Sequence, residues 1–204
     1  FYGALWHESR RRLLKLWQWM PEKASRASKD GKDGKDGKAG KSAKVDSHVD
    51  LDALAARKIA ALEGAQACIA TSSGMSAILL LGMGLLKAGD HVICSRSVFG
   101  STIMLFGREF AKFGVETTFV SQTDIAEWES AVKPSTRLLF AESPTNPLTE
   151  VCDIAALSAI AKRAGAWLAV DNCFCSPALQ RPMEYGADLV IHSGTKYLDG
   201  QGRV

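Results

Sequence analysis

The chain has 204 residues, of which 47% are hydrophobic and 23% charged, a composition that suits a globular domain and excludes an intrinsically disordered protein. Its longest apolar run, residues 77–86, is interrupted by glycines and is shorter than the roughly 18 residues that a membrane helix needs. Residues 1–44 are strongly basic and the remainder is mildly acidic. A nucleic-acid partner requires basic residues on a folded face, so this charge distribution gives no support for one.

The first 44 residues form a basic, low-complexity head that we expect to be disordered or partly helical. Residues 1–20 combine tryptophans with arginines, which is typical of a membrane-surface or partner helix but also of a segment unrelated to the rest. Residues 29–41 repeat Lys-Asp-Gly and contain no large apolar side chain, so they predict a solvated linker.

Beyond residue 46 the pattern becomes that of a folded domain. Apolar residues recur at helical spacing over 50–62, where Gly64 is a suitable stop, and a second helix is expected over 74–86. Strand-like runs then alternate with helical ones: strands at 91–95, 115–120, 137–142, 167–171 and 188–192, and helices at 101–113, 124–132 and 153–164. This alternation predicts an α/β three-layer sandwich with a mainly parallel sheet.

The cysteines argue for a reduced environment and against a metal site. Their number is odd, and they form no Cys-x-x-Cys pair and no zinc-binding spacing. We therefore expect reduced thiols, a cytoplasmic protein and no bound metal. The cysteines are Cys68, Cys94, Cys152, Cys173 and Cys175.

Polar residues follow three of the predicted strands, and in parallel sheets ligands collect at this edge. The start of the helix at Gly74 offers amide hydrogens to an anion, and hydroxyl groups follow the last strand. Asp171 ends an apolar strand, where a carboxylate can hold a protonated pyridine nitrogen, and Lys196 has the amine that an aldehyde requires. Together these features predict a site for pyridoxal 5'-phosphate. The residues predicted to bind its phosphate are Gly74, Met75, Ser193 and Thr195.

Each feature alone has a structural explanation, as a helix cap, a helix start or a surface lysine. A dinucleotide site is excluded, because Gly82-Met83-Gly84 lies inside a predicted helix and lacks the third glycine of that motif.

Over residues 57–203 the sequence resembles the Cys/Met-metabolism family of fold-type I pyridoxal-phosphate enzymes. Within that family, the segments 171–175 and 196–203 are most similar to the O-succinylhomoserine sulfhydrylases. The motifs that carry the resemblance are Ser73-Gly74-Met75-Ser76-Ala77, Ser97-Val98-Phe99-Gly100-Ser101-Thr102, Glu142-Ser143-Pro144-Thr145-Asn146-Pro147, Ala169-Val170-Asp171-Asn172 and His192-Ser193-Gly194-Thr195-Lys196-Tyr197.

The resemblance implies a role for each matching residue. Lys196 would be the catalytic lysine that forms the Schiff base with the cofactor and carries protons, while Asp171 would hold the pyridine nitrogen. Phe99 would stack on the cofactor ring, at a position usually occupied by Tyr in the lyases. Asn146 would lie near the phenolic oxygen of the cofactor or the substrate carboxylate.

The resemblance also implies an incomplete protein. Residues 45–204 correspond to part of the cofactor-binding large domain, whereas residues 1–44 match nothing in the family. The Tyr-x-Arg pair that family members donate to a neighbouring subunit has no match in residues 40–56. The family's C-terminal domain is likewise absent from this sequence, so we expect a fragment.

Two kinds of function follow from these expectations. The first is γ-replacement on an activated homoserine ester in methionine biosynthesis, with O-succinylhomoserine and sulfide giving homocysteine. Cystathionine γ-synthase, cystathionine γ-lyase and methionine γ-lyase activities are alternatives within the family. The second is a non-catalytic remnant that at most binds the cofactor. The expected partner is a small amino-acid substrate, with no nucleic acid or membrane, and the complete enzyme is expected to be a homotetramer.

Overall fold

The structure, a computed structural model, describes residues 2–6 and 51–199. The rest of the basic head and residues 200–203 of the last motif lie outside the described residues. The strands are β1 (Tyr2–Trp6), β2 (Ala67–Thr71), β3 (His91–Ser95), β4 (Glu116–Val120), β5 (Thr136–Glu142), β6 (Trp167–Asp171) and β7 (Leu189–Ser193). The helices are α2 (Leu51–Glu63), α3 (Gly74–Leu85), α4 (Gly100–Met104), α5 (Ile125–Ser130), α6 (Ile154–Ala164) and α7 (Ser176–Leu179). Single turns η1 (Leu105–Glu109), η2 (Phe110–Phe113), η3 (Pro182–Tyr185) and η4 (Tyr197–Asp199) complete the elements.

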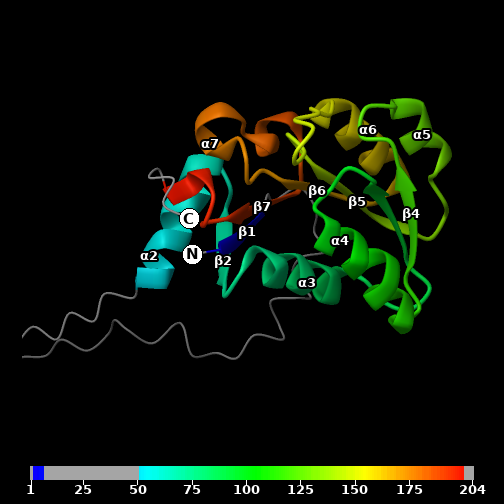
Figure 1. The fold of residues 1–204 in the computed structure, drawn as a ribbon, viewed down its shortest axis with the longest axis horizontal. Coiled ribbons are helices and arrows are strands. Elements are labelled where there is room, and N and C mark those ends of the chain that lie inside the picture. The colour runs from blue at the N-terminus through cyan, green and yellow to red at the C-terminus, as the bar shows by residue number, and fades with distance from the viewer. Residues whose placement is uncertain (1, 7–50, 200–204) are drawn as a thin grey trace, which may run out of the picture. The chain divides into compact units, whose positions relative to one another are not determined.

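The strands form one seven-stranded sheet in the order β2-β1-β7-β6-β5-β3-β4 (Figure 1). Neighbouring strands from β7 to β4 pair in parallel, which confirms the predicted parallel α/β architecture. Strand β1 lies between β2 and β7 and pairs antiparallel with both. Residues 2–6 are therefore a strand, which corrects the expectation of a disordered or partly helical head at these positions. The sequence analysis predicted neither β1 nor β2.

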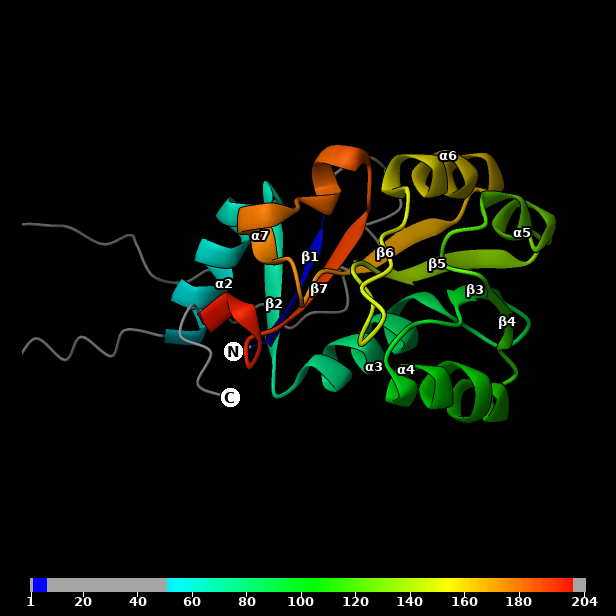
Figure 2. The same cartoon turned by 45° about the horizontal axis from the view of Figure 1, so that its top comes forward.

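Helices cover both faces of the sheet. Figure 2 shows α5 and α6 on one face and α3 and α4 on the other. Side chains that alternate along each central strand enter two separate cores. In β5, for example, Leu138 and Phe140 pack with α3, whereas Leu139 and Ala141 pack with α6. This alternation confirms the three-layer sandwich and explains why the central strands are apolar throughout.

Local sequence explains where α3 begins and how it packs. The hydroxyl of Ser73 accepts the N–H of Ser76 at 3.0 Å, a typical N-cap. A Cβ atom added to Gly82 would lie 2.2 Å from the ring of Phe110, so this glycine allows α3 to pack closely against η2. The first glycine of the Gly-x-Gly sequence in α3 thus serves helix packing. This agrees with the exclusion of a dinucleotide-binding motif.

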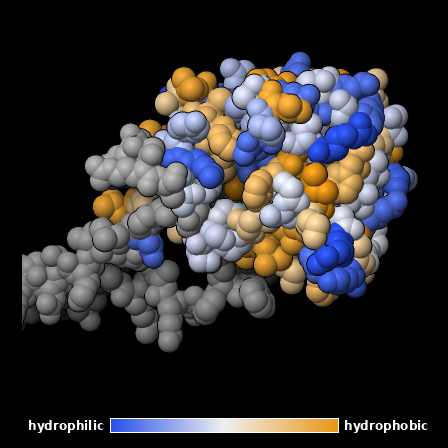
Figure 3. All heavy atoms as spheres, in the orientation of Figure 1, coloured by the Kyte–Doolittle hydropathy of each residue, from blue (hydrophilic) through white to orange (hydrophobic). Residues whose placement is uncertain are grey.

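The outer face of α3 is apolar, and Figure 3 shows an apolar area over this helix. Leu79, Leu80 and Met83 are each between 44% and 60% exposed. In the described part of the chain, no helix has the length and apolar character needed to span a membrane.

The topology determines where a ligand can bind. Strands β5, β6 and β7 are neighbours in the sheet and run in the same direction, so their carboxyl ends lie at one edge. The N-terminus of α3 meets that edge, because a Cβ atom added to Gly74 would lie 3.2 Å from Cβ of Ser193 at the end of β7.

Candidate cofactor site

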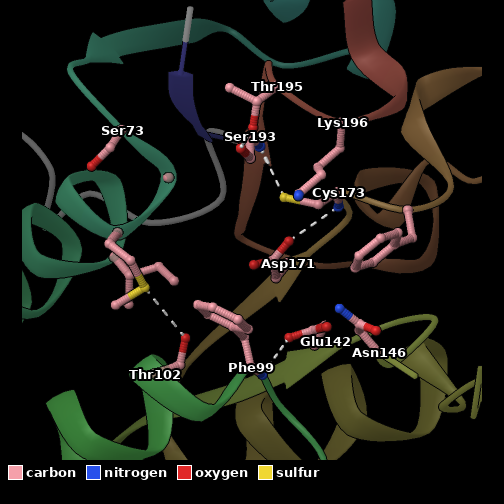
Figure 4. Close-up of a pocket in the computed structure, with 14 residues that line it drawn as sticks. Ser73, Phe99, Thr102, Glu142, Asn146, Asp171, Cys173, Ser193, Thr195 and Lys196 are labelled. Carbon is pink, nitrogen blue, oxygen red and sulfur yellow. Dashed lines mark hydrogen bonds between the residues drawn. The ribbon is translucent and has the colours of Figure 1, made fainter. Parts of the chain in front are cut away.

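A cavity of about 290 Å³ opens where the carboxyl ends of these strands meet the start of α3 (Figure 4). Every residue that the sequence predicted for the site lines it: Gly74, Met75, Phe99, Asn146, Asp171, Ser193, Thr195 and Lys196. The sequence analysis assigned no site role to its other lining residues, which are Ser73, Ile78, Thr102, Glu142, Cys173 and Phe174. The fold therefore gathers residues that are far apart in the sequence, from Ser73 to Lys196.

One end of the cavity has the features of an anion seat. The first amides of an α-helix have no carbonyl partner within the helix, and here they belong to Gly74 and Met75. The hydroxyl oxygens of Ser193 and Thr195 are 2.8 Å apart, and Figure 4 shows both beside the start of α3. Helix amides and hydroxyl groups on either side of one space suit a phosphate group.

Asp171 supplies a buried negative group within the cavity. Its Oδ1 accepts the N–H of Cys173 at 3.0 Å, and the residue is 7% exposed. Burial raises the pKa of this carboxyl above its ordinary value, although hydrogen bonds from Cys173 and the charge of His192 act in the opposite direction. Because burial disfavours the ionised form of this carboxyl, positive charge placed in the cavity would stabilise its carboxylate.

Lys196 follows β7 in a turn in which its N–H donates to the carbonyl oxygen of Ser193 at 3.1 Å. The side chain is exposed and lines the same cavity as Asp171. Figure 4 shows it pointing toward Asp171 and Cys173. Lys196 and Asp171 thus share one cavity, as the sequence predicted.

Phe99 and Asn146 lie across the cavity from the lysine (Figure 4). Phe99 is 49% exposed although its ring is apolar, which leaves an aromatic face available to a flat ligand. Its N–H donates to Oε2 of Glu142 at 2.7 Å. Glu142 was quoted in a motif but was not predicted as a site residue. A charged residue at the end of an apolar strand is the signal that could have identified it.

A buried polar network supports the site from the other face of the sheet. Nε2 of His192 lies 2.6 Å from Oε1 of Glu63, and neither side chain is exposed. The amide of Asn172 donates to the same oxygen at 3.0 Å and accepts from Gln180 at 3.0 Å. Asn172 follows Asp171, and His192 precedes the anion seat. The network therefore links α2 to both strand ends that carry site residues.

The thiols near the site are free, as are all cysteines in the described residues. Cys173 is buried against the strand ends, and its Sγ accepts the N–H of Ser193 at 2.8 Å. Burial, the first cause, and the nearby Asp171 raise the pKa of this thiol far above its ordinary value. The group remains a neutral thiol at physiological pH.

The residues present fit pyridoxal 5'-phosphate. An anion seat lies at one end of the cavity, and the buried carboxyl of Asp171 lines the same cavity. An amine that can react with an aldehyde is provided by Lys196. A side chain at position 74 would press against Ser193. The glycine therefore lets the first amides of α3 lie close to the hydroxyl of Ser193, with space for an anion beside them.

Curated relatives with named activities match most of this chain. O-succinylhomoserine sulfhydrylase of Pseudomonas aeruginosa is 62% identical over 146 residues, which are 72% of this chain and 36% of that protein. L-methionine gamma-lyase of Pseudomonas putida is 43% identical over 158 residues, 78% of this chain and 39% of that protein. The chain therefore spans little more than a third of the length of these curated relatives.

The structural comparison leads to the same group. The crystal structure of metB from Corynebacterium glutamicum is similar with a TM-score of 0.70 at 41% sequence identity, covering 73% of this chain and 39% of that one. Residues 51–204 match the family described as Cys/Met metabolism PLP-dependent enzyme. Family members use pyridoxal phosphate, as the sequence predicted. With this match over most of its length, the chain belongs to the Cys/Met metabolism family of PLP-dependent enzymes.

Proposed function

We propose that this chain is the cofactor-binding part of an O-succinylhomoserine sulfhydrylase. The observation that carries the proposal is the single cavity that brings Lys196, Asp171 and the start of α3 together. The proposed reaction replaces the succinate group of O-succinylhomoserine by sulfide and yields homocysteine and succinate.

Sequence identity supports the sulfhydrylase over the related reactions. The Pseudomonas aeruginosa sulfhydrylase is 62% identical to this chain, whereas a probable cystathionine gamma-synthase of Herpetosiphon aurantiacus is 45% identical. Identity near 43% does not separate the reactions, because both a Mycobacterium tuberculosis sulfhydrylase and the Pseudomonas putida lyase have that value. Phe99 also supports the proposal, because the lyases of the family that the sequence resembles usually have a tyrosine at this position.

Each residue has a distinct task in the proposed reaction. When bound, pyridoxal phosphate supplies an aldehyde that takes an amino group and a ring that accepts electrons. Lys196 would hold the cofactor through its Nζ amine, and the same amine would carry protons for the amino-acid substrate. The carboxylate of Asp171 would keep the ring nitrogen protonated, and the first amides of α3 would hold the phosphate. Phe99, which lines the cavity, would stack on the cofactor ring and exclude water from it.

The reaction is tested with purified protein and added pyridoxal phosphate. O-succinylhomoserine and sulfide are supplied together, and homocysteine and succinate are measured. Equal amounts of the two products, with no cleavage of methionine in a parallel assay, support the sulfhydrylase. Rapid cleavage of methionine without added sulfide supports the lyase instead, and synthesis of cystathionine from added cysteine supports the synthase.

The chain by itself has a second candidate function, the binding of cofactor without turnover. Its length favours this candidate, since it spans 36% of the Pseudomonas aeruginosa relative. A covalent linkage to Lys196 without formation of homocysteine supports it. We also propose a cytoplasmic location and assembly of the complete enzyme into a homotetramer, which size-exclusion chromatography with light scattering tests.

A further inference from the structure

Glu142 ends β5 at the wall of the cavity and is only 2% exposed. Its Oε2 accepts the N–H of Phe99 at 2.7 Å, and the backbone N–H of Asn146 also hydrogen-bonds to the carboxylate. Its backbone oxygen accepts the side-chain amide of Gln122 at 2.6 Å, so the residue is anchored beneath the cavity. One carboxylate therefore holds two segments that leave different strands.

These two segments carry groups that face the proposed cofactor. Phe99 belongs to the connection between β3 and α4, and Asn146 to the loop after β5. We propose that Glu142 is a positioning residue whose carboxylate fixes the places of Phe99 and Asn146 across the cofactor cavity. The geometry of this proposal depends only on the chain, whereas its consequence for cofactor binding rests on the proposed function.

The second carboxylate oxygen distinguishes this residue from a simple loop anchor. Oε1 of Glu142 is buried and has no hydrogen-bond partner among the described residues. A buried carboxylate oxygen without a partner is unfavourable, and protonation of that oxygen relieves the penalty. The protonated form still accepts the N–H of Phe99 through Oε2, but more weakly, because a hydrogen bond to an ionised acceptor is roughly twice as strong.

The surroundings of Glu142 favour this protonation. Asp171 is its register partner on β6, so two carboxyl groups lie side by side. Cys94 from β3 and Cys173 also face it, and Lys196 lines the far side of the cavity. Burial, followed by the charge of Asp171, raises the pKa of Glu142 to about 7, against the lowering effect of the two backbone N–H groups. Near neutral pH the hydrogen bonds to both segments therefore change strength.

The experiment follows the backbone amides in the cofactor-free chain. In ¹⁵N-labelled protein, the amide resonances of Phe99 and Asn146 should shift together between about pH 5.5 and about pH 8.5, with one midpoint near 7. Glu142→Gln should abolish both titrations, because the amide accepts hydrogen bonds but does not ionise in this range. Asp171→Asn should lower the midpoint by removing the neighbouring charge. Glu109→Gln, at an exposed carboxylate, should leave it unchanged.

A second measurement connects the geometry to the cofactor. Glu142→Gln keeps an acceptor oxygen and should bind pyridoxal phosphate within about threefold of the wild type, whereas Glu142→Ala should bind about tenfold more weakly. The proposal is overturned if the two amides do not titrate, if their titration survives in Glu142→Gln, or if Glu142→Ala binds as tightly as the wild type. If wild-type protein binds no cofactor but its amides titrate as expected, the proposed function fails while the role of Glu142 in positioning the two segments stands.

Discussion

Gly74 at the start of α3 packs directly against Ser193 at the end of β7, since a Cβ atom on the glycine would lie 3.2 Å from that of the serine. Gly74→Ala should therefore move the helix amides away from the hydroxyl groups and weaken pyridoxal phosphate binding by about tenfold. Fluorescence titration of the cofactor measures the change.

A matched control lies in the same helix. Gly84 has no atom within 4 Å of an added Cβ atom, so Gly84→Ala should leave cofactor binding unchanged and stabilise the chain by about 0.5–1 kcal/mol. Equal losses of affinity in the two variants would contradict the assignment of the anion seat to Gly74.

Asp171 should be unfavourable for the stability of the cofactor-free fold. A carboxyl whose pKa is raised by burial takes up protons on folding, so its contribution to stability is lost as pH rises above its unfolded pKa. Asp171→Asn should therefore raise the free energy of unfolding at pH 7 by about 1 kcal/mol while weakening cofactor binding. Urea denaturation and cofactor titration measure the two effects, and a loss of stability would contradict the stated cause.

The buried pair of Glu63 and His192 should contribute strongly to folding. Glu63→Ala leaves the imidazole and the amide of Asn172 without their shared acceptor, so the free energy of unfolding should fall by about 3 kcal/mol. Glu63→Gln retains one side-chain acceptor oxygen and should lower the free energy of unfolding by less. Glu129, which pairs with Arg163 at the surface, provides the control, because Glu129→Gln should change the value by less than about 0.5 kcal/mol. Similar losses at both sites would contradict a special role for the network.

His91 should make stability depend on pH. Its ring nitrogens lie 2.8 Å from the hydroxyls of Thr136 and Thr118. Burial, followed by the charge of Lys133, lowers its pKa, with Glu116 acting in the opposite direction. The unfolded chain thus binds the proton more tightly, and the contribution of neutral His91 is lost as pH falls below about 6.5. Between pH 7.5 and 5.5, the free energy of unfolding measured with urea should fall by about 1 kcal/mol more in the wild type than in His91→Asn. Equal decreases in the two proteins would contradict this role.

Much of the fold follows from local pattern in the sequence. The strands at residues 91–95 and 167–171 were predicted with their observed bounds, because buried parallel strands are continuous apolar runs between polar ends. Strand β2 was missed because Ala67–Thr71 contains small residues and is only partly buried. The helix expected over 101–113 is instead an α-helical start followed by a wider and then a tighter turn. Strand β1 depends on partners far away in the sequence, which no local pattern contains.

The site was predictable where its chemistry is specific to a residue type. Lys196, Asp171 and the glycine at the start of α3 each follow a strand or open a helix, and parallel topology brings such positions together. Glu142 and the network around Glu63 were not predicted, because their importance lies in contacts between side chains on different elements. Those contacts depend on which face of a strand meets which helix, and this requires the packed structure.

In the proposed site, the amine of Lys196 meets the aldehyde of pyridoxal phosphate inside the cavity that Asp171 lines. The most direct measurement is to add the cofactor to the chain, reduce with borohydride and locate the modified residue by peptide mass spectrometry. We expect one modified lysine, Lys196, and no modification at this position in a Lys196→Ala variant that remains folded. Modification spread over surface lysines, or unchanged in amount in Lys196→Ala, would contradict it.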